Sequence, residues 1–223
     1  MGLRESKKQE TRQLISDCAT KLFIEQGFEP TTIAEIATAA RVARKTVTNY
    51  FPRKEDLALD HHEAFTQGLA RTVAERRPDE TPLAALGRTF RAALLAHDPV
   101  VGFTGPAFAR MVADSPTLTA RLRELHDHRE DALARALADA AAPTDAAPNT
   151  APDTAPEAAP DTHSPLAIAP RAAAALIAAA DRLLFRRIQE LTLAGHDNDR
   201  IEATLLPEAD HLRALLDTAL ATR

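Results

Sequence analysis

The sequence predicts an all-α fold, and three observations support this prediction. Hydrophobic residues make up 45% of the 223 residues, yet aromatic residues make up only 4% and tryptophan is absent. Alanine and leucine dominate the apolar residues, which favours helix–helix packing over a sheet-based core. Apolar residues also recur at helical spacing along most of the chain. We therefore expect helices with enough apolar surface to form a packed core.

Cysteine usage and the lengths of the apolar runs indicate the compartment. Cys18 is the single cysteine, so neither an intrachain disulfide nor a cysteine-based zinc site can form. The first residues are polar, and no apolar run approaches the roughly 20 residues needed to span a bilayer. We expect a cytoplasmic protein with no membrane partner. The sequence lacks the motifs of phosphate-binding loops, serine and zinc hydrolases and dinucleotide sites, so we expect no catalytic residue, no cofactor and no metal.

Charge is distributed unevenly along the chain. Residues 1–57 hold 10 Lys and Arg against 8 Asp and Glu, for a net charge of +2. Residues 58–223 hold 17 Lys and Arg against 24 Asp and Glu, for a net charge of −7, and every lysine lies in the first segment. A basic segment ahead of an acidic one is typical of a protein that contacts phosphate groups with one end only.

The first predicted helix spans Glu10 to Gln26, where one apolar stripe repeats at positions i, i+4 and i+8. Gly27 ends this helix, because glycine readily adopts the left-handed conformation that follows a helix. Thr32 and Glu35 then form a capping box, which starts a second helix. The apolar face of the second helix ends at Ala40.

A turn at residues 41–43 leads to a third predicted helix, Arg44 to Tyr50. Val47 faces the core, and the polar residues lie opposite it or flank it. The N-terminal part of such a helix can reach base edges in the major groove of DNA, while neighbouring groups hold phosphates. The predicted base-reading residues are Arg44, Lys45, Thr46, Thr48 and Asn49. Thr31 and Thr32 are the predicted phosphate contacts beside them.

The rest of the chain predicts a larger helical unit. Helices are expected at Lys54–Arg76, Leu83–His97, after a loop within 101–113, at Thr117–Ala141, at Arg171–Ala194 and at Asp199–Ala221. An Ala/Pro-rich segment at about 143–167 cannot bury enough apolar surface to order itself, so we expect a flexible linker. We expect domains at residues 1–53 and 54–223. The last two helices carry more leucine than a lone hairpin can hide, so they form the expected homodimer interface.

The segment from Thr11 to Leu57 resembles the N-terminal domain of the tetracycline-repressor (TetR) family. The resemblance lies in the runs LFIEQGFEPTTIAEIATAARVARKTV and NYFPRKEDL, whose elements stand in the family's order and spacing. It implies three N-terminal helices that bind double-stranded DNA, followed by a variable helical body that binds a small ligand and dimerises. It also implies phosphate contacts from Tyr50 and Lys54.

Three positions depart from the family's pattern. Arg41 stands where the turn usually has glycine, so it has to adopt a left-handed conformation at a cost of about 1 kcal/mol. Thr48 stands where a tyrosine commonly contacts phosphate, and Arg53 replaces a small polar residue before the next helix. These departures leave an alternative open: a helical ligand-binding or scaffold protein whose DNA-binding head is degenerate.

The expected function is ligand-responsive regulation of transcription, with repression favoured. A homodimer would bind a palindromic operator, and a small lipophilic effector in the body would tilt the long Lys54–Arg76 helix and release the DNA. The residues expected to line the effector site are Phe65, Phe90, Phe103, Phe108, Met111, Phe185 and Ile188. His97 and Arg186 are the expected polar anchors, and each residue of this set could instead belong to the plain core.

Overall fold

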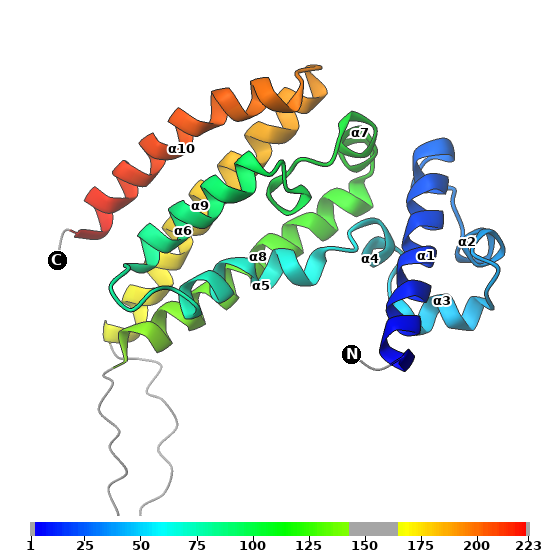
Figure 1. The fold of residues 1–223 in the computed structure, drawn as a ribbon, viewed down its shortest axis with the longest axis horizontal. Coiled ribbons are helices and arrows are strands. Elements are labelled where there is room, and N and C mark those ends of the chain that lie inside the picture. The colour runs from blue at the N-terminus through cyan, green and yellow to red at the C-terminus, as the bar shows by residue number, and fades with distance from the viewer. Residues whose placement is uncertain (1–2, 143–164, 222–223) are drawn as a thin grey trace, which may run out of the picture.

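The computed structural model describes residues 3–142 and 165–221, and the regular elements of these ranges are all helices (Figure 1). They are α1 (Leu3–Gln26), α2 (Ile33–Ala39), α3 (Arg44–Tyr50), α4 (Lys54–Ala58), α5 (His62–Ala74), α6 (Pro82–Leu95), the 3-10 helix η1 (Pro99–Val101), α7 (Pro106–Asp114), α8 (Pro116–Ala141), α9 (Pro165–Leu193) and α10 (Asn198–Ala221). The predicted all-α fold is confirmed. We call α1–α4 the head and α5–α10 the body.

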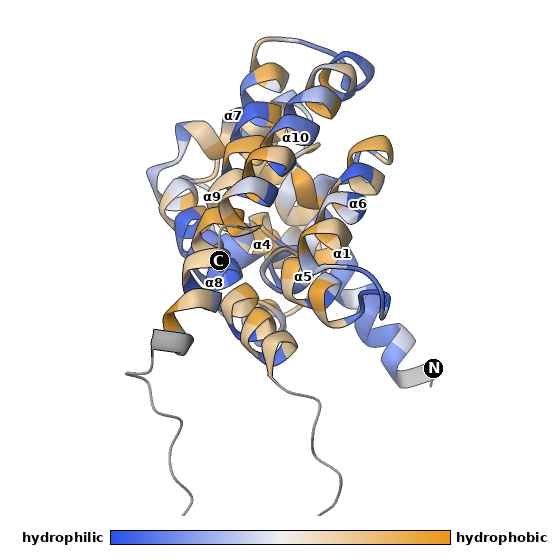
Figure 2. Cartoon of the chain, turned by 90° about the vertical axis from the view of Figure 1, so that its left-hand side faces the viewer, coloured by the Kyte–Doolittle hydropathy of each residue, from blue (hydrophilic) through white to orange (hydrophobic). Residues whose placement is uncertain are grey.

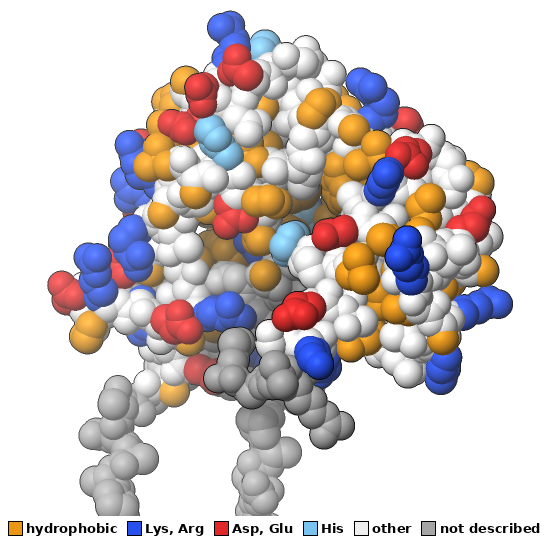
Figure 3. Space-filling view, turned by 45° about the vertical axis from the view of Figure 1, so that its right-hand side comes forward, with side chains coloured by type: hydrophobic (Ala, Val, Ile, Leu, Met, Phe, Trp, Pro, Cys, Tyr) orange, Lys and Arg blue, Asp and Glu red, His pale blue; other side chains and the backbone are white. Residues whose placement is uncertain are grey.

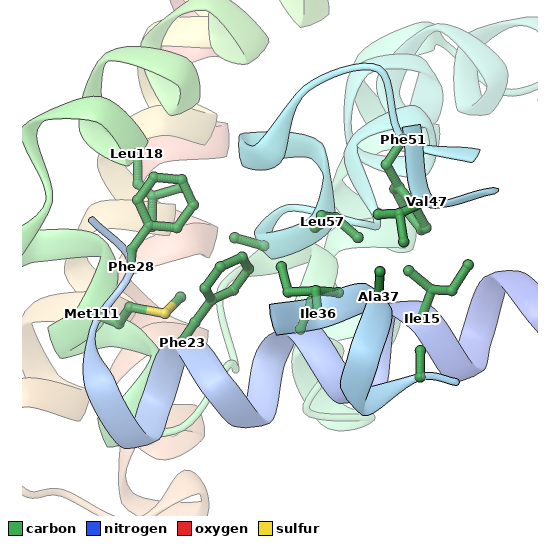
Figure 4. Close-up of a cluster of buried hydrophobic side chains, with 13 residues drawn as sticks. Ile15, Phe23, Phe28, Ile36, Ala37, Val47, Phe51, Leu57, Met111 and Leu118 are labelled. Carbon is green, nitrogen blue, oxygen red and sulfur yellow. The ribbon is translucent and has the colours of Figure 1, made fainter. Parts of the chain in front are cut away.

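The head is built around one apolar cluster between α1, α2, α3 and α4 (Figure 4). Ile15 of α1, Ile36 of α2, Val47 of α3 and Leu57 of α4 are each 0% exposed. The capping box predicted at the start of α2 is present, because the Thr32 backbone N–H donates to Glu35 Oε2 over 2.7 Å and the Glu35 N–H donates to Thr32 Oγ1 over 3.2 Å. Local sequence signals and core packing therefore agree in this unit.

The body has α8 at its centre, packed along α5 on one side and α9 on the other. α10 lies on α9 and α6, as Figure 1 shows. Hydrophobic and hydrophilic residues alternate around most of these helices (Figure 2), which is the pattern of helices that bury one face. Two apolar clusters result, one around Leu94 and Ile188 and one around Val73 and Leu133.

Head and body share a continuous core. Met111 of α7 and Leu118 of α8 belong to the same buried cluster as Phe23 and Phe28 of the head, and Figure 4 shows these four side chains turned toward one another. Phe23 and Phe28 also form a tilted ring pair with centroids 5.0 Å apart. Apolar packing therefore holds the head at a defined position on the body.

The predicted helix Lys54–Arg76 is wrong as a single element. The chain breaks at residues 59–61 into α4 and α5, where Leu59 has φ −106° and ψ 52° and ends α4. Asp60 in the break accepts a hydrogen bond from Ser16 Oγ of α1 over 2.5 Å. The break separates Leu57, which packs in the apolar cluster of the head, from Phe65, which is buried in the body.

Two helix starts also differ from the prediction. α1 begins at Leu3 rather than Glu10, and the bonds Ser6 Oγ to Glu10 and Thr11 Oγ1 to the Lys7 carbonyl lie along these added turns. α9 begins at Pro165 rather than Arg171, so the last residues of the predicted linker are helical. The remainder of that linker, residues 143–164, lies outside the described residues.

Candidate nucleic-acid interface and ligand cavity

The turn between α2 and α3 fixes the direction of α3. Arg41 has φ 54°, so the left-handed conformation expected there is present. The Val42 N–H donates to the Ala37 carbonyl over 3.0 Å, and the Thr46 N–H donates to the Ala43 carbonyl over 2.8 Å to start α3. The fully buried side chain of Val47 then fixes the rotation of α3 about its own axis. Arginine thus takes the place of glycine at a cost of about 1 kcal/mol without disrupting the motif.

The outward face of α3 is polar and basic. Arg44, Lys45, Thr48 and Asn49 are exposed, and Thr46 is half-buried. Within the described part of the chain, neither Arg44 nor Lys45 takes part in an ion pair, and α3 contains no acidic residue. Four of the five predicted base-reading residues therefore lie on one solvent-facing surface with unneutralised positive charge, as a helix that enters the major groove requires.

Two of the predicted phosphate contacts, Thr31 and Lys54, form hydrogen bonds inside the head. Thr31 is 1% exposed, and its Oγ1 donates to the Gly27 carbonyl over 2.7 Å and accepts from the Gln26 side-chain amide over 3.2 Å. The Lys54 ammonium donates to the carbonyls of Phe28, Glu29 and Thr31 over 2.8, 3.2 and 3.0 Å. The three carbonyl acceptors match the three ammonium hydrogens, so both side chains stabilise the α1–α2 connection.

The other two predicted phosphate contacts remain accessible. Thr32 is exposed at the start of α2, and Tyr50 is half-buried at the end of α3. Arg12 of α1 donates from Nη1 to the Tyr50 carbonyl over 3.2 Å and lies 4.3 Å from the centroid of the Phe51 ring. This arginine fastens the end of α3 to α1, a contact that no local pattern could have predicted between residues 38 positions apart.

A cavity of about 1010 Å³ lies between the head and the body. Its walls come from α1, the α4–α5 break, α5, the η1–α7 segment, α8 and α9. The face drawn in Figure 3 is hollowed between the two units. Five residues of the predicted effector site line this cavity: Phe65, Phe103, Phe108, Phe185 and Arg186. A space of this size with mainly apolar walls can enclose a drug-sized molecule.

The other four residues of the predicted effector site lie elsewhere. Phe90 lines a separate space of about 80 Å³ between α6, α9 and α10. His97 follows α6 with φ 50°, and its Nε2 lies 3.0 Å from Glu202 Oε2 of α10. Met111 packs in the shared core of head and body, and Ile188 is 0% exposed in the cluster of α6, α9 and α10. The sequence could not place these four residues, because helical periodicity identifies buried positions but cannot separate the wall of one cavity from other buried sites.

A buried aromatic and charged cluster supports one wall of the cavity. The His126 ring meets the rings of Phe65 and Phe185 edge-on, with centroids 5.0 and 5.5 Å away. Burial lowers the pKa of His126 from 6.5 to about 4, so its imidazole is neutral near pH 7. The buried Arg129 guanidinium donates to Asp181 and to the Phe65 carbonyl, and lies 4.6 Å from the Phe65 ring centroid. Phe65 and Phe185, two of the phenylalanines that line the cavity, are thereby packed against His126.

Ion pairs also join the head to α8. Arg121 Nη2 lies 2.9 Å from Asp56 Oδ1 of α4, and both side chains are largely buried. Glu124 Oε2 accepts from Arg121 over 2.8 Å and from Arg53 over 3.1 Å. The hydrogen bond from Arg121 and the charge of Arg53 lower the pKa of Glu124, so the carboxylate stays ionised. Arg53, which departs from the family pattern, therefore contacts the body instead of capping α4.

Among the described residues, no group of three or more His, Cys, Asp or Glu side chains is arranged to hold a metal ion. No helix within the described ranges combines the length and the hydropathy that crossing a membrane requires.

Comparison with known proteins identifies similar sequences. Residues 15–60 match the family described as bacterial regulatory proteins, tetR family. The chain is 33% identical over 139 residues to the HTH-type transcriptional regulator TcmR of Streptomyces glaucescens. The aligned residues make up 60% of this chain and 62% of TcmR. It is 49% identical over 49 residues to the HTH-type transcriptional regulator AcrR of Shigella flexneri. Here the aligned residues make up 22% of this chain and 23% of AcrR. The chain thus spans less than two thirds of the length of these relatives.

Two solved structures share the fold over almost the whole chain. One, described as a TetR-family transcriptional regulator of Syntrophomonas wolfei, has a TM-score of 0.52 at 18% identity and covers 93% of this chain and 96% of its own. The other is NalD of Pseudomonas aeruginosa, described as the secondary repressor of the MexAB-OprM multidrug efflux pump. It has a TM-score of 0.52 at 19% identity and covers 94% of this chain and 95% of its own. At these identities the likeness concerns the fold alone.

Proposed function

We propose that the chain, whose residues 15–60 match the tetR family of bacterial regulatory proteins, is a ligand-responsive transcriptional repressor that binds an operator in double-stranded DNA. It acts as a homodimer on a roughly palindromic site and is released by a small lipophilic effector. The observation that carries this proposal is the outward face of α3, where Arg44, Lys45, Thr48 and Asn49 are exposed while Val47 anchors the helix in the head.

The chemistry of this face suits direct reading of bases. Arg44 and Lys45 can donate to O6 and N7 of guanine, and Asn49 can pair with N6 and N7 of adenine. Each well-formed bidentate contact contributes about 1–3 kcal/mol of discrimination against a wrong base. Thr32 and Tyr50, at the two ends of the α2–α3 unit, are the proposed phosphate contacts. Arg41 also points its charge to solvent from the turn and can add a phosphate contact.

The homodimer is proposed to form through α9 and α10. Leu176 and Leu183 of α9 are 47% and 46% exposed, and Leu215 of α10 is 53% exposed. Exposed leucines on two neighbouring long helices favour association with a second copy. A two-fold symmetric pair would place two copies of α3 about one helical turn of DNA apart, or roughly 34–36 Å, so each head would read one half of a palindrome.

Release is proposed to depend on the cavity between head and body. An effector there would contact α1 and the α4–α5 break together, and it changes the position of the head only if it binds one arrangement more tightly than the other. The Ser16–Asp60 hydrogen bond joins the break to α1, so a displacement at the break is passed to the helix that supports α3. This replaces the expected tilt of one long helix with a movement at a break between two helices.

The proposal is tested by fluorescence anisotropy with a labelled DNA fragment from upstream of the gene and a scrambled fragment of equal length. We expect saturable binding that prefers the upstream fragment and weakens steeply with salt, since each neutralised phosphate contributes about 0.9 to the slope of log affinity against log salt. Arg44→Ala should weaken specific binding by at least tenfold, which corresponds to about 1.4 kcal/mol.

A matched control is Arg135→Ala, which removes an exposed arginine from α8 in the body and should leave DNA affinity unchanged. Weak binding that is equal for both fragments, with no difference between the two variants, would support a helical ligand-binding or scaffold protein with a degenerate head instead.

A further inference from the structure

The head itself forms one wall of the cavity. Seven residues of α1, spaced along one side of the helix, line it: Gln13, Ser16, Asp17, Thr20, Lys21, Ile24 and Glu25. The cavity is therefore not enclosed by the body alone, and a molecule inside it lies against the helix that carries the core of the DNA-binding unit. Any ligand of this cavity would contact head and body at the same time.

The two sides of the cavity differ in polarity. The wall formed by the body is largely apolar, with Phe103, Phe108, Val112, Leu122, Phe185 and Leu193. The wall formed by α1 and the α4–α5 break is polar and includes the carboxylates of Asp17, Glu25 and Asp60. A molecule that satisfies both sides needs an apolar or aromatic portion on one side and a polar group on the other.

The sign of charge on the polar wall favours a cation. Lys21 contributes a positive charge to this wall, and its Nζ lies 3.9 Å from Glu25 Oε1. Asp17 accepts from the neutral Gln13 amide over 2.8 Å, and Asp60 accepts from the neutral Ser16 hydroxyl.

His61 Nε2 is 3.7 Å from Asp60 Oδ1, which is beyond hydrogen-bond distance, and Arg186 comes from α9 on the opposite side of the cavity. The wall formed by α1 and the break thus has carboxylate charge that Lys21 does not balance.

We propose that the effector is a lipophilic cation, with its apolar rings against the body and its positive group between Asp17 of α1 and Asp60 of the break. This inference rests on the proposed function, in which the cavity holds the effector. Because one carboxylate belongs to α1 and the other to the break after α4, the cation draws α1 and the break toward the ligand. Effector binding then acts on the head by direct contact rather than through the packing of the body.

The test uses the full chain without DNA and two fluorescent probes with the same three-ring skeleton. At mildly alkaline pH, 9-aminoacridine is a cation and acridine is neutral, so the pair isolates the effect of charge. DNA is left out because both probes intercalate. We expect 9-aminoacridine to bind about tenfold more tightly than acridine. Asp17→Asn and Asp60→Asn should each reduce this preference by about threefold and leave acridine binding unchanged.

Asp131→Asn is the matched control, since Asp131 is exposed on α8 and does not line the cavity. The proposal is overturned if the two probes bind equally, if acridine binds more tightly, if neither binds, or if all three variants weaken both probes alike. Tighter binding of the anionic probe 8-anilinonaphthalene-1-sulfonate than of 9-aminoacridine would assign the site to anions through Lys21 and Arg186. DNA binding by the unliganded protein, measured separately, tests the proposed function alone, so the two can fail independently.

Discussion

Replacing Lys54 by methionine separates a structural role from a DNA contact. Methionine keeps most of the length and an unbranched apolar side chain near the Phe28 ring, whose centroid lies 4.2 Å from Lys54 Nζ. It removes the three hydrogen bonds to carbonyls of the α1–α2 connection. A hydrogen bond with a charged partner contributes about 1.5–3 kcal/mol net. The three hydrogen bonds share one ammonium group, so their contributions do not add in full. Ordering the lysine side chain also costs up to about 2 kcal/mol of conformational entropy. We therefore expect Lys54→Met to lower the free energy of unfolding by about 2–3 kcal/mol.

The assay has two readouts, urea unfolding followed by circular dichroism and the salt dependence of operator binding. Lys54→Met should unfold at lower urea concentration with an unchanged m-value, because the surface exposed on unfolding is the same. Where the variant is still folded, its plot of log affinity against log salt should have the slope of the unmodified protein.

Lys45→Met is the matched control with the opposite expectation. Lys45 is exposed on α3 and free of ion pairs within the described residues, so its loss should change stability by less than about 0.5 kcal/mol. It should reduce the salt slope by about 1 if Lys45 contacts a phosphate, or relax base preference if it reads guanine. Our assignment of Lys54 would be refuted by a variant of full stability whose DNA affinity and salt slope both fall.

Three further changes probe the packing that positions the site. Arg121→Met leaves the largely buried Asp56 carboxylate without its cation and should cost about 3 kcal/mol in urea unfolding, whereas a cost below about 1 kcal/mol would mean that the pair is effectively solvated. His126 is neutral when folded, with its pKa lowered from 6.5 to about 4, so the unfolded chain binds more protons between these values and stability rises with pH across them. Lowering the pH from 7 to 5 should therefore reduce the free energy of unfolding of the unmodified protein by about 2 kcal/mol more than that of the His126→Phe variant. Equal reductions in the two proteins would contradict a buried neutral imidazole. Arg41→Gly should raise the free energy of unfolding by about 0.5–1 kcal/mol because glycine adopts a positive φ without strain, and a destabilised variant would argue against the left-handed turn.

The head could be predicted in detail because its signals are local. The Thr32–Glu35 capping box spans four consecutive residues, and the rotation of α3 follows from the burial of Val47 within a seven-residue helix. The outward position of Arg44, Lys45, Thr48 and Asn49 follows from the same periodicity. Even the strained turn at residue 41 could be expected, since the motif requires that conformation whichever residue occupies it.

The errors concern interactions between residues far apart in the sequence. Lys54 meets carbonyls 23 to 26 positions away, and nothing near Lys54 indicates that its charge is used there. The break at residues 59–61 interrupts an apolar pattern that continues on both sides, so periodicity alone joined α4 to α5. It is fixed instead by the Ser16–Asp60 bond, across 44 positions.

The cavity could not be assigned from the sequence for the same reason. Its walls come from several elements, and α1, which the sequence connects only with the head, supplies one of them. An apolar residue on a helical stripe has the same pattern whether it faces the cavity, as Phe65 does, or the packed core of the head, as Ile15 does. Size and packing decide between these outcomes, and both depend on the folded chain.

The central claim, that α3 reads operator bases, is tested most directly by measuring how Asn49→Ala changes base preference. Affinities of the unmodified protein and the variant would be compared for a set of operators that each carry one substituted base pair. We predict that Asn49→Ala loses discrimination of about 1–3 kcal/mol at one adenine in each half-site, at two symmetry-related positions, and keeps its preferences elsewhere. A variant that weakens binding to every operator equally, with all base preferences retained, would contradict base reading by this face of α3.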